Sequence, residues 1–430
     1  MARFSRKWER AYEGFTLIEL LIVIGIVVIL STAVVLALNP AELLRQARDS
    51  TRFQEIAVLN KGFSLFEFEG APGGYGNPSS TYFSVHDAAA TTTVATYCTG
   101  MGINGPPVGR LYRCAASSTV NLVNGNGWMP VNFGAISAGA PFSRLPRDPT
   151  NTVASENYFT YVASSGSAWA FTIPLESIKY LVTAKQDDGY NPAKYEIGKD
   201  ISLVAVSEGL VGWWPFDEGI GLIANDKSKN GNNGALANGP TWVAGKLNRA
   251  VNFDGLDDNV NAGSQSSLDN ISKLSTCAWI YPRSIGQVNG SNQYGEIVTK
   301  GDGTGGWFLE LSNQDSGFAS VYFYRTFLGS DGYWHGSNNA VQLNVWSYVC
   351  LTYDNTSAAN NPSLYVNGSP LTVTQYYTPS GSANSDATGN LYIGNYDSIN
   401  QTFDGWIDDV RVYNRILSAL EVQKLYNATK

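Results

Sequence analysis

The sequence predicts a multidomain protein with a long N-terminal α-helix, a middle region of short β-prone pieces, and an all-β C-terminal half. Its 430 residues exceed the length of one ordinary domain. An apolar run from Phe15 to Leu38 leads into an amphipathic stretch, which is the pattern of one long helix. Beyond about Ser207, aromatic segments that alternate apolar and polar side chains recur at regular intervals, as half-buried antiparallel strands do.

Composition and charge narrow the classes of function. Charged residues make up 15% of the chain and the net charge is −8 without a basic block, so we expect no nucleic-acid partner. The two histidines, His86 and His335, are too few for a zinc-protease motif and argue against a Ser-His-Asp triad. We expect both histidines to be surface or packed loop residues.

The four cysteines form no C-x-x-C pair, which argues against a zinc ribbon or a thioredoxin-like site. If the body of the protein is exported, two disulfides are expected. Four cysteines allow three connectivities. The one that keeps each bridge local joins Cys98 to Cys114 and Cys277 to Cys350.

The apolar run is long enough to cross a membrane. As a helix, its 24 residues would measure about 36 Å, against a hydrocarbon core of about 30 Å. A short basic head precedes it, which places the C-terminal bulk outside the cytoplasm. A cleaved secretory signal and a plain membrane anchor are the alternatives. A secretory signal prefers a shorter apolar core and a small-x-small exit. A plain anchor has no use for Glu19, because a carboxylate inside a bilayer is costly and marks a functional partner by default.

The stretch GFTLIEL, Gly14 to Leu20, resembles the processing site of type IV prepilins and type II secretion pseudopilins. The resemblance implies that a prepilin peptidase cuts after Gly14 and that the new Phe15 amine is methylated. It also implies that Glu19 accepts this amine from a neighbouring subunit as the helices pack into a filament core. Amine and carboxylate each need the other in a low-dielectric core, so physical chemistry agrees.

The helix is expected to continue after a break. Asn39-Pro40 interrupts it, because proline lacks a backbone donor and clashes with the preceding turn. Apolar side chains then recur at three- and four-residue steps, and the helix should end before Gly70. The apolar stripe contains Phe53, Ile56, Leu59, Phe63 and Phe66, and the polar side contains Arg45, Arg48, Asp49, Arg52 and Glu55.

The middle region is rich in Gly, Ser, Thr and Asn and holds short β-prone pieces. Its segments RLPRDP (144–149) and YFTY (158–161) resemble the L-P-x-D-P and Y-x-Y pattern of pseudopilin heads. This resemblance implies a small α+β head, in which an antiparallel sheet is laid on the N-terminal helix.

The C-terminal half, roughly Gly209 to Tyr426, resembles the LamG-like, concanavalin A-like jelly roll of two packed antiparallel sheets. Landmarks run in the family's order, from GLVGWWPFDEG through AVNFDGLDDNV to FDGWIDDVRVYNRILSALEV. Asn367-Gly368 predicts a two-residue hairpin. This fold serves lectins, adhesive modules and glucanases, so it leaves the function open. Glucanases of the fold carry paired acids on one strand as E-x-D-x-x-E. No such run occurs here, and we expect a binding module and not an enzyme.

One acidic loop has two interpretations. It offers hard oxygen ligands for calcium in a structural role, and in related domains such a loop shares a cation with acids of the last strand. The implied ligands are Asp226, Asn230, Asn233, Asp408 and Asp409. Asn233 departs from the Asp that the family often shows. In the alternative, Asp226 and Asn233 cap turns and Asp408 pairs with a neighbour such as Arg411. The segment FDGLDD (253–258) has the same ambiguity.

Tryptophans of the C-terminal half could stack on sugar rings, but we expect most of them in the core. Trp334 lies in the loop GSDGYWHGSNN beside Tyr333 and His335. It is the best candidate for an exposed platform, so Tyr333 and Trp334 are the candidate ligand-binding residues.

These expectations divide the chain into four parts: a prepilin leader (1–14), an N-terminal helix (15–69, with 15–38 as the transmembrane and assembly segment), a pilin-like head (70–204) and a LamG-like jelly roll (205–430). They predict a minor type IV pilin-like subunit that waits in the bacterial cytoplasmic membrane and then joins an extracellular pilus or pseudopilus. Its expected partners are other pilin subunits, a prepilin peptidase, and a glycan or surface protein bound by the jelly roll.

Two alternatives remain at this point. The first is a pseudopilin of a type II secretion or DNA-uptake system that binds cargo through the jelly roll. The second is a membrane-anchored carbohydrate-active enzyme.

Overall fold

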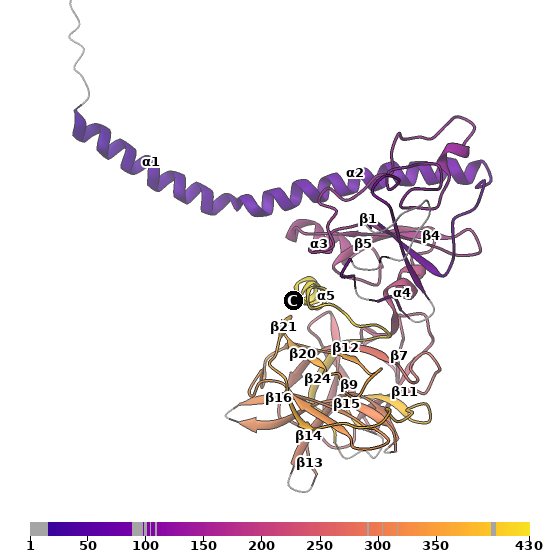
Figure 1. Ribbon diagram of the computed structural model, residues 1–430. Coiled ribbons are helices and arrows are strands. Elements are labelled where there is room, and N and C mark those ends of the chain that lie inside the picture. The colour runs from indigo at the N-terminus through magenta and orange to yellow at the C-terminus, as the bar shows by residue number, and fades with distance from the viewer. Residues whose placement is uncertain are drawn as a thin grey trace, which may run out of the picture.

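The computed structural model describes residues 16–87, 98, 101–103, 105–107, 110–289, 292–302, 304–315, 317–396 and 401–430. They form a long helix with a break, a small head packed on the second half of that helix, and a β-sandwich beyond the head (Figure 1). Within these ranges, no helix combines the length and the hydropathy that a membrane crossing requires.

The helix breaks where Asn39-Pro40 predicted it. Helix α1 (Leu17–Leu38) ends at Asn39, whose φ of 41° is left-handed, and α2 (Pro40–Phe68) begins at the proline. Proline fits the first turn of a helix because an amide there has no partner within the helix. The Asn39 side chain also caps α2 by accepting a hydrogen bond from the Glu42 amide at 3.4 Å. Helix α2 ends before Gly70, as expected.

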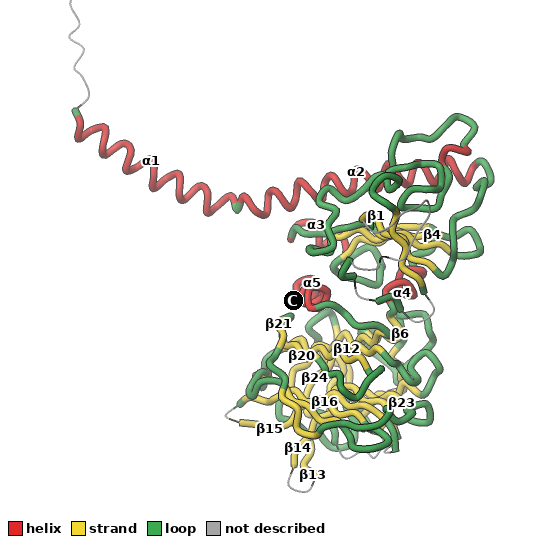
Figure 2. The backbone as a smooth tube through the Cα atoms, viewed as in Figure 1, coloured by secondary structure: helices red, strands yellow, loops and turns green. Residues whose placement is uncertain are grey.

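The head is a five-stranded sheet that covers the apolar stripe of α2 (Figure 2). Across the sheet the order is β2 (Leu111–Ala115), β1 (Ser80–His86), β3 (Thr160–Ala163), β4 (Trp169–Pro174) and β5 (Lys194–Gly198). The prediction of an antiparallel sheet is wrong for β1 and β2, which run parallel. A parallel pair needs a long crossover, and residues 87–110 separate these two strands. The head also contains η1 (Phe133–Ala135) and α3 (Ile178–Ala184).

The polar side of α2 differs from the prediction at two positions. Asp49 and Arg52 are fully buried. Arg52 Nε lies 2.6 Å from Asp148 Oδ2, and Arg52 Nη1 lies 2.7 Å from both Asp49 Oδ1 and Glu176 Oε2. Asp148 is the acid of the RLPRDP segment, so this motif supplies a carboxylate partner for the buried Arg52 of helix α2. A buried charge of this kind is tolerated only with such partners.

The C-terminal part is the predicted sandwich of two antiparallel sheets. The smaller sheet has the order β21 (Ser369–Pro370), β20 (Ser363–Val366), β19 (Ser347–Asp354), β12 (Lys273–Pro282), β24 (Asp404–Tyr413), β10 (Arg249–Asp254) and β9 (Thr241–Ala244), with β6 (Leu210–Trp214) paired to β24. The larger sheet has the order β22 (Thr374–Tyr377), β17 (Gly332–His335), β16 (Phe318–Arg325), β15 (Gly306–Asp315), β14 (Asn292–Gly301), β23 (Asn390–Ile393), β11 (Asn259–Gly263), β8 (Gly234–Ala237) and β7 (Ile223–Ala224). Strand β13 (Gln287–Asn289) pairs with β14, and β18 (Val341–Gln342) pairs with β16.

The predicted hairpin and both predicted disulfides are confirmed. Asn367 and Gly368 join β20 to β21 at φ of 51° and 75°, the left-handed values that such a turn requires. Cys277 and Cys350 are register partners on β12 and β19, with Cα atoms 4.1 Å apart. The Cα atoms of Cys98 and Cys114 lie 5.3 Å apart. The Cys277–Cys350 bridge fastens two strands of the sandwich, and the Cys98–Cys114 bridge closes a loop of the head.

A short helix joins the head to the sandwich. Helix α4 (Ser202–Glu208) spans the boundary expected at residues 204–205, and β6 begins two residues later. Val204 and Ala205 are buried in a core that also holds side chains of both domains. Helix α5 (Ala419–Thr429) follows β24 and lies between the sandwich and the head (Figure 1).

Candidate functional site

The predicted processing site lies at the start of the described structure. Gly14 and Phe15 are outside the described residues. Glu19 lies in the first turn of α1, where its carboxylate accepts hydrogen bonds from the Thr16 amide at 2.9 Å and the Thr16 hydroxyl at 2.8 Å. This reciprocal cap stabilises the start of the helix. The role of Glu19 toward a second subunit stays a prediction.

In the acidic loop, three of the predicted calcium ligands hold a turn. The carboxylate oxygens of Asp226 accept hydrogen bonds from three backbone amides and from the Ser228 hydroxyl, at 2.8 to 3.0 Å. Asn233 Oδ1 accepts from the Asp226 amide at 2.8 Å, and Asn230 Nδ2 donates to the Ser228 hydroxyl at 3.0 Å. These contacts match the turn-capping alternative.

On the last strand, Asp408 and Asp409 have different partners. Asp409 pairs with Arg411 at 3.1 Å, so the expected pairing of Asp408 with Arg411 is wrong. Alternate side chains of a strand share a face, which places Arg411 beside Asp409. Asp408 instead accepts from the Leu247 amide at 2.8 Å, and burial raises its pKa to about 8.

Among the described residues, the three acids of the predicted set, Asp226, Asp408 and Asp409, do not form a group whose oxygens all lie within 4.8 Å of one another. In the part of the chain that the structure describes, one group of three acids brings its oxygens within 4.8 Å of one another, and it consists of Asp254, Asp257 and Asp258. Calcium stays a prediction.

Strand β17 separates the two predicted ligand-binding residues onto opposite faces of the larger sheet. Trp334 is 0% exposed, and its Nε1 donates to Asn361 Oδ1 at 2.9 Å. The prediction of an exposed Trp334 is therefore wrong. Successive side chains of a strand point to opposite faces, and Trp334 takes the face that packs on the sandwich core. Tyr333 points the other way and lines a pocket on the outer face.

This pocket, which we call the tyrosine pocket, has a volume of about 320 Å³, within the range of small-ligand sites. Its walls are mainly aromatic, with neighbouring ring centroids 4.9 to 5.9 Å apart. The rings come from β14, β15, β16, β17, β22 and the segment after β23. They are Tyr294, Phe308, Tyr324, Tyr333, Tyr377 and Tyr396, and the other lining residues are Glu296, Gly305, Glu310, Thr326 and Gln401.

Two glutamates supply the acidic groups of the tyrosine pocket. Glu296 on β14 and Glu310 on β15 are register partners, with exposures of 0% and 4%. Glu310 Oε1 accepts a hydrogen bond from the Tyr333 hydroxyl at 2.9 Å. Neither oxygen of Glu296 meets a hydrogen-bond donor among the described residues. Its neighbour is the carboxyl group of Glu310, which is itself an acceptor unless one of the pair is protonated.

Burial favours the protonated form of this pair. Desolvation raises the pKa of Glu310 to about 7. Desolvation, with the Glu310 carboxyl as a second cause, raises the pKa of Glu296 well above its ordinary value. The described residues that line the pocket include no lysine, arginine or histidine to offset these carboxyl groups. At neutral pH the pair therefore retains a proton and can both donate and accept hydrogen bonds.

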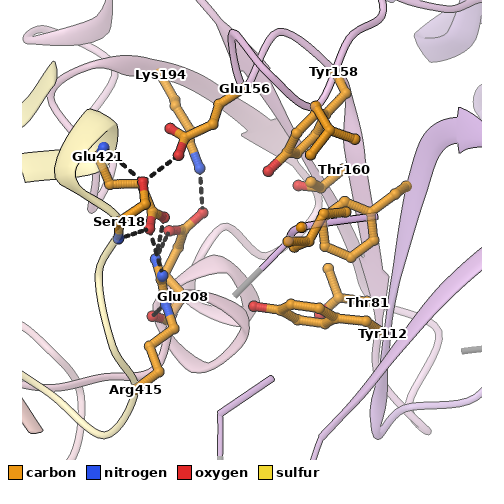
Figure 3. A pocket seen from close by; sticks show the side chains of 14 residues that line it. Thr81, Tyr112, Glu156, Tyr158, Thr160, Lys194, Glu208, Arg415, Ser418 and Glu421 are labelled. Atoms are coloured by element: carbon orange, nitrogen blue, oxygen red, sulfur yellow. Dashed lines mark hydrogen bonds and ion pairs between the residues drawn. The ribbon is translucent and has the colours of Figure 1, made fainter. Parts of the chain in front are cut away.

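A second pocket lies where the head meets the sandwich (Figure 3), but its volume of about 50 Å³ leaves room for little more than a water molecule. Five charged residues line it, and four of them form ion pairs with one another. Arg415 Nη2 lies 2.9 Å from Glu208 Oε2 and 2.7 Å from Glu421 Oε1, and Lys194 Nζ lies 2.7 Å from Glu208 Oε1. We call these four residues the junction cluster, and its ion pairs connect the head to the sandwich.

A wider cleft of about 700 Å³ also lies at the junction. Its lining includes Lys185, Lys227, Lys229 and Lys246, together with the ion pair of Asp409 and Arg411. None of its described lining residues has a buried polar atom without a partner, whereas Glu296 in the tyrosine pocket has two. The tyrosine pocket is therefore the better candidate for a ligand site.

Two family models match the chain. Residues 10–35 match the prokaryotic N-terminal methylation motif, and residues 253–423 match the concanavalin A-like lectin/glucanases superfamily. The chain fuses a prepilin-type segment to a LamG-like domain. The methylation motif is typical of prepilin-type proteins that are anchored in a membrane and assembled into pili. The second match contains all the lining residues of the tyrosine pocket of this prepilin–LamG fusion, including Glu296 and Glu310.

Several solved structures resemble part of the prepilin–LamG fusion. Domain 4 of AbnA, an extracellular arabinanase from Geobacillus stearothermophilus in complex with arabinotriose, is 16% identical with a TM-score of 0.37, over 50% of this chain and 97% of that chain. The SAP-like pentraxin from Limulus polyphemus is 17% identical with a TM-score of 0.28, over 35% and 68%.

The ligand-binding domain of botulinum neurotoxin serotype D, in complex with N-acetylneuraminic acid, is 14% identical with a TM-score of 0.39, over 53% and 52%. The fusion therefore spans about half of that domain. No curated protein matches the chain.

Sequence reasoning missed the glutamate pair because it searched for paired acids along a single strand. Glu296 and Glu310 lie on neighbouring strands, and only the register of β14 against β15 brings them together. A usable signal was present in the alternation of β15 and β16. In these strands Phe308, Glu310, Tyr322 and Tyr324 share the outer face, while the residues between them enter the core.

Proposed function

We propose that the prepilin–LamG fusion is a low-copy filament subunit that displays a glycan-binding module outside the cell. The methylation motif supports membrane anchoring followed by assembly, and the lectin/glucanase family model supports a glycan ligand. A head with a whole sandwich attached would crowd a densely packed filament. This steric argument favours a minor, tip-proximal subunit over a major one.

The tyrosine pocket carries the proposal. Sugar rings present apolar C–H faces that pack on aromatic rings, and six such rings line this pocket. The Glu296–Glu310 pair and Gln401 add hydrogen-bonding groups that fix a ligand's orientation. A concave, mostly aromatic site with a few convergent polar groups is the usual form of a small-ligand site.

We propose binding without catalysis. Retaining glycosidases hold two carboxyl groups about 5 Å apart with the scissile bond between them, and inverting ones hold them farther apart. Glu296 and Glu310 instead lie on adjacent strands as direct register partners, and both are buried, which differs from two exposed carboxyl groups that flank a bound sugar. Release of reducing ends from a polysaccharide by the purified protein would contradict this part of the proposal.

A glycan array with the full-length protein in detergent tests the pocket. Tyr377 is 62% exposed, so Tyr377→Ala should leave the fold intact while removing one wall of the site. We expect bound glycans to lose about tenfold in affinity, the scale of one aromatic contact. Leu328 is 77% exposed and lies outside the pocket, so Leu328→Ala is the matched control. Equal glycan binding by all three proteins would contradict the proposed site.

Two measurements test the filament part. Mass spectrometry of the mature N-terminus should find methylated Phe15, and an intact Met1 would contradict processing. Immunogold labelling should place the protein on extended pili. Labelling confined to the envelope would favour the pseudopilin alternative.

A further inference from the structure

The tyrosine pocket holds two adjacent buried acids and no cation among its described lining residues, whereas some buried acids of the sandwich have an arginine beside them. The buried acid Asp386 has Arg325 at 3.1 Å, and the buried acid Asp409 has Arg411 at 3.1 Å. The Glu296–Glu310 pair has only the Tyr333 hydroxyl, a neutral donor. Buried carboxylates are costly without a positive partner. The described lining therefore leaves a positive charge to be supplied from outside the protein.

The walls of the pocket suit the same kind of ligand. The faces of tyrosine and phenylalanine rings carry a negative quadrupole that attracts cations, and ammonium groups in particular. Tyr324 and Tyr333 approach at 5.9 Å, as do Tyr333 and Tyr377, so several ring faces border one space. A divalent metal ion would require six or more oxygen ligands, or nitrogen and sulfur ligands, and this lining does not provide either set.

We propose that the tyrosine pocket selects glycans that carry a protonated amine, such as oligosaccharides of non-acetylated glucosamine. The ammonium group would pair with the carboxyl group of Glu310, which adjoins Glu296, while the sugar ring packs on the tyrosines. This inference rests on the proposed function, and it names the ligand class of the same site. N-acetylation of the sugar removes the charge, so it should remove most of the affinity.

Calorimetric titration of the full-length protein in detergent tests the inference. The probes are the tetramer of glucosamine, the tetramer of N-acetylglucosamine, and choline as a permanently charged ammonium without a sugar. At pH 6 we expect the glucosamine tetramer to bind at least about tenfold more tightly than its acetylated form, the scale of one charge-assisted hydrogen bond. Binding should also release protons, because the ammonium replaces the proton that the pair shares. Titrations in buffers of different ionisation enthalpy measure this release.

Variants locate the effect. Glu310→Gln keeps the shape of the side chain and removes its charge, so the preference for the amine should fall to about twofold or less. Glu218→Gln, on an acid outside the pocket, is the matched control and should leave the preference unchanged. Among the described residues, further titratable groups on this face are the tyrosines, Asp331 hydrogen-bonded to Tyr324, and His335 beside Tyr322. Asp331→Asn and His335→Gln should not alter proton release. Thermal melting of each variant shows whether it is folded.

The outcomes separate the two proposals. If both tetramers bind equally and Tyr377→Ala weakens both, the glycan site stands and the amine inference falls. If neither tetramer binds but choline binds in a Glu310-dependent way, the charge argument stands and the glycan proposal falls. If none of the three probes binds, the amine inference is contradicted.

Discussion

The junction cluster and the tyrosine pocket both bury carboxyl groups, yet they balance them differently. In the junction cluster, Glu208 and Glu421 share Arg415, and Lys194 adds a second cation to Glu208 (Figure 3). In the tyrosine pocket, Glu296 and Glu310 adjoin each other without a cation among the described lining residues.

This difference appears in the pKa values. Burial opposes ionisation at both sites, but Arg415 overcomes it and lowers the pKa of Glu421 to about 2. No cation does so in the pocket, where burial raises the pKa of Glu310 to about 7. A balanced buried cluster is satisfied by the fold itself. An unbalanced one retains a proton and is available to a ligand, which is why we assign structure to the first and recognition to the second.

The largest expected effect comes from breaking the balanced cluster. Arg415→Met leaves Glu208 and Glu421 buried without this cation, and such a loss should destabilise the protein by about 3–5 kcal/mol. Urea unfolding followed by tryptophan fluorescence measures it. Arg45→Met, which removes the pair of the exposed Arg45 side chain with Glu42 at 3.7 Å, is the control and should cost less than about 1 kcal/mol. Equal losses in the two variants would show that the junction cluster does not hold the domains.

The next effect is a pH dependence of opposite sign at the two sites. The folded pKa of Glu310 lies above its ordinary value of 4.5, so the folded state binds more protons and stability falls as pH rises from about 4.5 to about 7. Unfolding of wild type and Glu310→Gln at pH 5 and pH 8 measures this. The decrease in the free energy of unfolding between these two pH values should be about 3 kcal/mol smaller in the variant than in wild type.

Glu421 gives the control for this comparison. Its folded pKa of about 2 lies below the ordinary value, so its contribution is present above about pH 4.5 and is lost as pH falls toward 2. Glu421→Gln should therefore alter the acid side of the stability profile and leave the range from pH 5 to pH 8 unchanged. An identical profile for wild type and Glu310→Gln would contradict the raised pKa of the pocket pair.

A smaller effect distinguishes the two faces of the larger sheet. Tyr377→Ala should weaken glycan binding by about 1–1.5 kcal/mol and change the free energy of unfolding by less than about 0.5 kcal/mol, because the side chain is exposed. Trp334→Ala should instead lower the free energy of unfolding by about 3–5 kcal/mol, because it leaves a cavity at a core position. Calorimetry and urea unfolding measure the two quantities. A strong loss of stability in Tyr377→Ala would show that the pocket wall is a packing element.

The smallest effect concerns calcium. The Asp226 carboxylate accepts four hydrogen bonds from protein groups, which satisfy its oxygens without a cation, so we expect a chelator to shift the melting temperature of the full-length protein by less than about 1 °C. Differential scanning calorimetry with and without the chelator provides the measurement. A drop of several degrees would support the predicted cation site.

Much of the fold was predictable because local patterns specify it. Asn39-Pro40 ends one helix and starts the next through the proline's own geometry, and Asn367-Gly368 makes a hairpin because both residues tolerate left-handed φ. The buried stripe of α2 follows from helical periodicity. The burial of Arg52 did not follow, because its partners Asp148 and Glu176 are about a hundred or more residues away in sequence.

The candidate site was less predictable, since strand registers decide it. The sequence alone determined that the chain carries a prepilin-type motif, a long helix and a sandwich of alternating strands. Tertiary structure decided that Tyr333 faces outward and Trp334 inward, and that Glu296 meets Glu310 across β14 and β15. The physical reason is that periodicity is a property of neighbours along the chain. A shared proton or a missing cation depends on groups that only strand pairing brings together.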